Sequence, residues 1–68
     1  MEENFIKEIA HEMLVNLLDG KTENVSTELL NETKTKAIEI VQKKIENNDG
    51  GIALLSQLMI EISQINTL

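Results

Sequence analysis

Glu8 and His11 are the two residues of this chain whose spacing best matches a known metal chemistry. They form the Glu-x-x-His pattern of di-iron helical bundles, in which residues three apart share one helix face. Such a centre needs a second copy of the pattern and further inward carboxylates, which a homodimer would have to supply. Both residues lie on the polar arc of their expected helix. We therefore predict no metal site and no cofactor, and keep a metal-binding helical dimer as a third hypothesis of function.

Catalysis is not expected either. His11 is the single histidine, and histidine is the side chain best suited to exchange protons at neutral pH. An enzyme also needs a second group to position that histidine and a pocket to enclose the substrate. With no Cys, Tyr, Trp or Arg in 68 residues, the sequence supplies few such groups. We predict a non-enzymatic protein with no catalytic residues.

The charge balance is acidic, with twelve Asp and Glu against six Lys and a net charge of −6. Arginine, the usual side chain for recognising phosphate and guanine, is absent, and Phe5 is the only aromatic residue. Direct binding to nucleic acid is therefore disfavoured. The alternative that this charge suggests is a small acidic inhibitor, of the kind carried by phages and mobile elements, which blocks a basic nucleic-acid-binding surface. Its carboxylates would be those of Glu2, Glu3, Glu8 and Glu12.

Nothing in the sequence predicts export or membrane insertion. The residues Met1-Glu2-Glu3-Asn4 are acidic, whereas a secretory signal begins with positive charge. The most apolar stretch, 52–65, carries several polar residues and is shorter than a membrane span. We expect a cytoplasmic protein with no membrane contact.

Apolar residues recur at helical spacing in three segments, which predicts one small domain, 1–68, with helices over about 4–19, 26–47 and 51–66. In the first segment they come as adjacent pairs every four residues: Phe5, Ile6, Ile9, Ala10, Met13, Leu14, Leu17 and Leu18. These pairs cover about 220° of the helix, more than the roughly 100° of an ordinary surface helix. We expect Asp19-Gly20 to end this helix.

The second helix should begin at an N-cap on Ser26, with Glu28 favourable to the helix dipole in its first turn. Its weak stretch is 31–36, where Lys34 falls on the apolar arc and either a bend or a later start is compatible with the pattern. In the next loop, Gly50 or Gly51 is expected to take a positive φ, and Asn48 or Asp49 to cap the third helix.

The fold class that follows is all-α, either a three-helix bundle or an open helical hairpin with a third helix. The first and third helices are too apolar for a lone three-helix monomer, so we expect oligomerisation or a protein partner to complete the fold. The main functional hypothesis is a helical protein–protein interaction module, such as a small adaptor, regulator or chaperone-like protein, that buries an amphipathic helix of a partner or of itself. The expected interface residues, some of which must also be core, are Phe5, Ile9, Val15, Leu17, Leu55, Leu58, Ile60, Ile62 and Ile65.

The segment Gly50-Gly51-Ile52-Ala53-Leu54-Leu55-Ser56-Gln57-Leu58 resembles the closing segment of some needle-subunit co-chaperones of type III secretion. The resemblance covers nine of the 68 residues and does not by itself place the chain in that family. Those co-chaperones are short acidic helical hairpins that hold an aggregation-prone partner. The resemblance therefore implies a chaperone-like interaction protein, although three helices depart from a plain hairpin.

Overall fold

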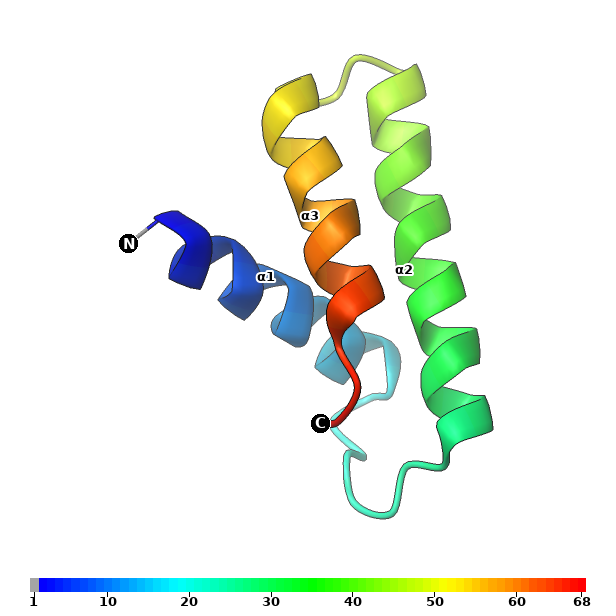
Figure 1. The fold of residues 1–68 in the computed structure, drawn as a ribbon. Helices are drawn as coiled ribbons and strands as arrows, with labels where there is room; N and C mark the ends of the chain where they lie inside the picture. Colours follow the sequence, from blue (N-terminus) through cyan, green and yellow to red (C-terminus); the bar gives the residue numbers. More distant parts are fainter. Residues whose placement is uncertain (1) are drawn as a thin grey trace.

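The computed structural model describes the backbone of residues 2–68 and the side chains from residue 5 onward. The described residues form three helices and no strand: α1 (Glu2–Leu17), α2 (Thr27–Glu46) and α3 (Ile52–Gln64). Helices α2 and α3 lie side by side as an antiparallel hairpin, and α1 crosses the end of this hairpin where α3 finishes (Figure 1). The N-terminal half of α1 diverges from the hairpin. The all-α prediction is confirmed, and completion of the fold by a further chain stays a prediction.

The core lies where the three helices meet. Each helix contributes to it at helical spacing, through Ala10 and Leu14 of α1, Leu30, Ala37 and Val41 of α2, and Leu55, Leu58 and Ile62 of α3. The small side chains Ala10 and Ala37 are fully buried, which lets the helices approach closely. Half-buried residues, including Ile65 and Leu68 after the end of α3, pack around this cluster.

Helix α2 is continuous through the stretch in which a bend or a later start was compatible with the sequence. Thr33 is buried, and its Oγ1 donates to the carbonyl oxygen of Leu29 over 2.7 Å. Lys34 does not disturb the apolar arc, because its Nζ reaches past the core and donates to the carbonyl oxygen of Ile65 over 2.8 Å. The polar groups of this stretch thus find partners without breaking the helix.

Two of the expected helix ends are confirmed. Ser26 is the N-cap of α2, and its side chain accepts a hydrogen bond from the amide of Leu29 over 3.1 Å. After α1 the chain reverses at Asp19 and Gly20, with φ of 58° and 76°, and the Gly20 amide donates to the carbonyl oxygen of Val15. Helix α1 itself ends at Leu17, two residues before the expected boundary.

The start of α3 differs from the expectation. Gly50 takes the predicted positive φ, at 128°, but the N-cap is Gly51 and makes no side-chain capping bond. Neither Asn48 nor Asp49 caps the helix, so that prediction is wrong. The carboxylate of Asp49 instead lies 3.3 Å from Nζ of Lys44 in an exposed ion pair, which joins the loop to the last turn of α2.

Candidate functional site: a groove along helix α1

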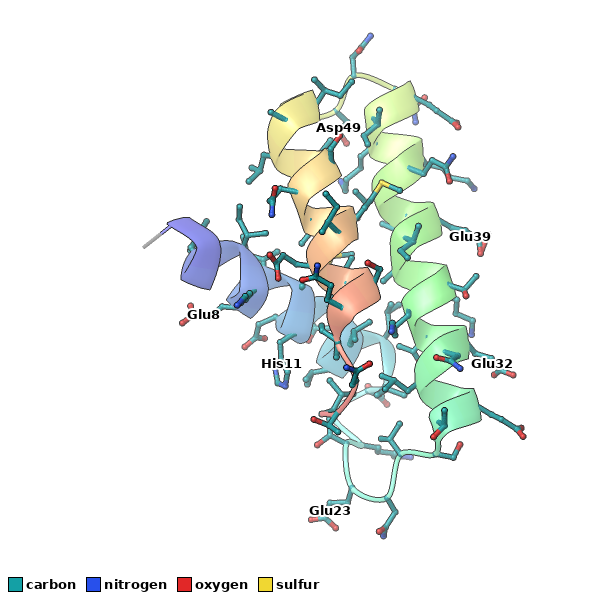
Figure 2. The ribbon with its side chains drawn as sticks, viewed as in Figure 1. Glu8, His11, Glu23, Glu32, Glu39 and Asp49 are labelled. Atoms are coloured by element: carbon teal, nitrogen blue, oxygen red, sulfur yellow. The ribbon has the colours of Figure 1, made fainter. Side chains whose placement is uncertain are left out.

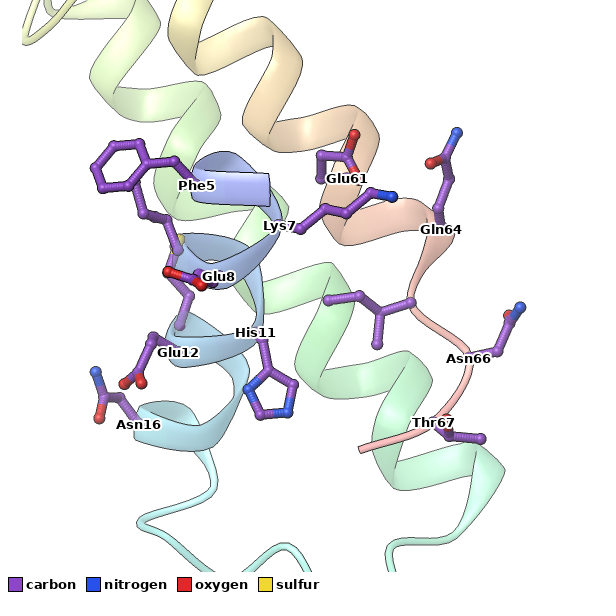
Figure 3. A pocket seen from close by; sticks show the side chains of 13 residues that line it. Phe5, Lys7, Glu8, His11, Glu12, Asn16, Glu61, Gln64, Asn66 and Thr67 are labelled. Atoms are coloured by element: carbon purple, nitrogen blue, oxygen red, sulfur yellow. The ribbon is translucent and has the colours of Figure 1, made fainter. Parts of the chain in front are cut away.

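An open groove of about 1010 Å³ runs along α1 and the C-terminal end of α3. Phe5, Ile9 and Met13 contribute apolar side chains from α1, and Ile65 contributes one from the segment that follows α3 (Figure 3). Phe5 is 59% exposed, whereas the other three are half-buried. The groove therefore offers apolar surface that this chain leaves partly uncovered.

The repeating pairs of α1 explain why this surface exists. Ala10 and Leu14 are the buried residues of the helix, and they face the hairpin. Phe5, Ile9 and Met13 follow one another at four-residue steps and form a second apolar stripe beside the first. The hairpin covers the first stripe fully and the second only in part, so that Ile9 and Met13 are half-buried and Phe5 is exposed at the edge of the groove.

Three carboxylates line the groove. Glu8 and Glu12 stand one turn apart on α1 and are exposed, and Glu61 approaches from α3. Glu61 is only 8% exposed and accepts one hydrogen bond, from Nε2 of Gln57 over 3.4 Å. Among the described side chains, the single ion pair is the distant one between Lys44 and Asp49, so none of the three groove carboxylates is paired with a cation.

Lys7 and His11 line the same groove on the side of α1 that faces the C-terminal segment (Figure 3). The side chain of Lys7 extends toward Glu61 without an ion pair to it. His11 and Glu8, the candidate metal ligands, both line the groove. No three His, Cys, Asp or Glu side chains of the described part of the chain gather closely enough to hold a metal ion.

A second, smaller hollow of about 280 Å³ lies between the end of α1 and α2. Its apolar residues, Leu17 and Ile40, are 39% and 40% exposed, and Lys36 and Lys43 stand beside them. This hollow carries the opposite charge from the main groove and has less than a third of its volume.

The nine expected interface residues separate into three groups. Phe5, Ile9 and Ile65 line the main groove. Leu55, Leu58 and Ile62 are buried in the core of this chain, so they are accessible to a partner only if the helices separate. Val15 is half-buried, while Leu17 and Ile60 are exposed outside the main groove, Ile60 at 48%.

Sequence reasoning did not foresee Glu61 as a site residue. A signal was present, because Leu58, Glu61 and Ile65 follow one another at three- and four-residue steps, so that Glu61 interrupts an apolar stripe. The residues after α3, Asn66 and Thr67, were also missed as part of the groove wall. Their placement depends on how the chain turns after Ile65, which no helical periodicity predicts.

Comparison with protein-family models, with curated proteins and with solved structures gave no match for this chain. Among the described residues, no helix has the length and apolar character needed to cross a membrane. The groove along α1 is therefore the feature from which a function can be inferred.

Proposed function

We propose that this chain is a non-enzymatic protein–protein interaction module whose binding surface is the groove along α1. The observation that carries the proposal is the row Phe5, Ile9 and Met13, an apolar stripe at four-residue steps that the chain's own hairpin leaves partly uncovered. Apolar stripes of this kind take up the apolar face of another helix. The partner would bury Phe5 most, because it is the most exposed of the three.

The shape and lining of the site favour this role over catalysis. Enzyme and cofactor sites are enclosed pockets in which a few polar groups converge on the reacting atom. Here the groove is open along α1, and its polar groups stand at intervals along the helix. That arrangement suits an extended contact with another macromolecule.

The proposal can be tested by capturing partners from lysates of the native host with the intact chain. We expect a protein that is retained by the wild type and lost with Phe5→Glu, since the new charge would be placed in the apolar stripe. Ile60→Glu is the matched control, because Ile60 is also exposed and apolar but lies outside the groove. Equal retention by both variants, or loss with Ile60→Glu alone, would contradict the proposal.

The acidic-inhibitor hypothesis makes a different demand on the same captured complex. A blocker of a basic nucleic-acid-binding surface should dissociate steeply as salt rises and should keep its partner when Phe5 alone is changed. A groove dominated by apolar contact should hold its partner at high salt. The salt dependence of the wild-type complex, measured beside Phe5→Glu, separates the two.

A further inference from the structure

We propose that the groove selects a basic amphipathic helix of another protein, one that carries Lys or Arg beside its apolar face. This inference rests on the proposed function and adds the chemical class of the partner. It follows from how the apolar and acidic side chains of the groove are arranged relative to one another.

The part of α1 that lines the groove sets the length of the partner segment. From Phe5 to Asn16 the lining of α1 spans eleven residue steps, or about 17 Å of helix. A partner helix of about three turns would match this span. Its leucine-like residues would follow one another at three- and four-residue steps, so that they meet Phe5, Ile9 and Met13 in turn.

The acidic side chains set the charge of that partner. Glu8 and Glu12 stand along one edge of the apolar stripe, on the side of α1 away from Glu61, toward which Lys7 extends (Figure 3). Neither Glu8 nor Glu12 is paired with a cation of the described residues. A helix with Lys or Arg flanking its apolar face would place cations opposite these carboxylates while its apolar face is buried.

Glu61 contributes less to this preference. Its side chain is 8% exposed and accepts a hydrogen bond of 3.4 Å from Gln57, and Lys7 extends toward it from α1 (Figure 3). The charge preference of the groove therefore depends on the two exposed carboxylates, Glu8 and Glu12.

A second copy of the chain is a less suitable occupant. The hollow between the end of α1 and α2 presents Ile40 beside Lys36 and Lys43, an apolar side chain with neighbouring cations, but it is small and also contains Glu39. Each chain, however, carries a net charge of −6, so two copies repel one another as a whole. A cationic partner is instead attracted both by the groove and by the overall charge.

The test uses the full chain and three synthetic helical peptides of about 14 residues, a length of roughly four turns. All three carry leucine at three- and four-residue steps, and they differ only in whether lysine, glutamine or glutamate flanks the leucine face. We expect the lysine peptide to bind about tenfold more tightly than the glutamine peptide, the gain from a few exposed ion pairs. The glutamate peptide should bind most weakly. Backbone amide shifts should change at Phe5, Ile9 and Ile65.

The matched variants show whether the groove carboxylates cause the preference. Glu8→Gln combined with Glu12→Gln should abolish most of the difference between the lysine and glutamine peptides. Glu32→Gln combined with Glu39→Gln makes the same change in net charge on the outer side of α2 and should leave the preference intact (Figure 2). All four positions are exposed, so folding should survive in both variants.

Three results would overturn the inference. Equal affinity for the lysine and glutamine peptides would show that the groove binds apolar helices without a charge preference, and the proposed function would stand. If the Glu8→Gln, Glu12→Gln variant still prefers the lysine peptide, the preference comes from the overall charge of the chain and not from the groove. If no peptide binds and the chain instead self-associates in a manner lost with Phe5→Ser, a second copy fills the groove.

Discussion

Nζ of Lys34, in the middle of α2, lies 2.8 Å from the carbonyl oxygen of Ile65, just beyond the end of α3. The last carbonyl groups of a helix have no partners within the helix, and a cation there also suits the helix dipole. This bond joins residues 31 positions apart and fixes the segment whose Ile65 forms one wall of the groove. One side chain therefore links the stability of the hairpin to the shape of the site.

Lys34→Met should lower the free energy of unfolding by about 1 kcal/mol, because it removes the charged donor while keeping the aliphatic stem. Lys36→Met, on the exposed side of the same helix, should change it by less than about 0.5 kcal/mol. Urea unfolding followed by circular dichroism measures both. Equal effects of the two substitutions would show that the Lys34 bond contributes nothing beyond general charge.

Ile62→Ala should cost about 2–4 kcal/mol, since Ile62 is fully buried among the three helices. A domain of this size has only a few kcal/mol of stability, so most of the helical signal should be lost at room temperature. Ile60→Ala, two residues away and 48% exposed, should cost less than about 1 kcal/mol. Similar losses at both positions would mean that Ile60 is also buried, in an assembly larger than one chain.

These two isoleucines illustrate what the sequence predicts and what it does not. The spacing of apolar residues was sufficient for three helices and for the Ser26 cap, because both depend on local geometry. The spacing placed Ile62 and Ile60 on different faces of α3. It did not show which of the two is buried in the core and which is free to contact a partner, because that depends on which faces the neighbouring helices cover. The continuity of α2 through 31–36 was likewise open, since it depends on the distant contact between Lys34 and Ile65.

The same reasoning explains the error at the start of α3. Asn48 and Asp49 are good capping residues by type, yet the cap falls on Gly51, which makes no side-chain bond. Asp49 is instead paired with Lys44 in the last turn of α2, and the spacing of residues in the loop does not predict this pairing. Residue type predicted where the chain turns, but not which residue caps the helix after the turn.

Gly50→Ala should be destabilising by about 1–3 kcal/mol. Gly50 has a φ of 128°, which residues other than glycine rarely adopt, and an added Cβ would lie 3.2 Å from Cδ1 of Leu55. Gly51→Ala is the control, because its Cβ would meet nothing within 4 Å. Thermal melting of the two variants should separate them clearly, and a Gly50→Ala chain that melts with the wild type would contradict the loop conformation.

Glu61→Met should raise the free energy of unfolding by about 1 kcal/mol, equivalent to a melting temperature roughly 4–8 °C higher. The substitution removes a poorly hydrated carboxylate and keeps a side chain of similar length against α1. Gln64→Met, an exposed neighbour in the groove, should leave the melting temperature nearly unchanged. A less stable Glu61→Met chain would show that the carboxylate contributes to folding.

The most direct test of the groove as a binding surface is site-specific photo-cross-linking in the native host. Benzoylphenylalanine at position 5 keeps the aromatic ring of Phe5 in the groove, and the same residue at position 60 samples exposed apolar surface outside it. The account predicts a discrete cross-linked protein from position 5 and none from position 60. A product from position 60 alone, or the same products from both positions, would contradict it.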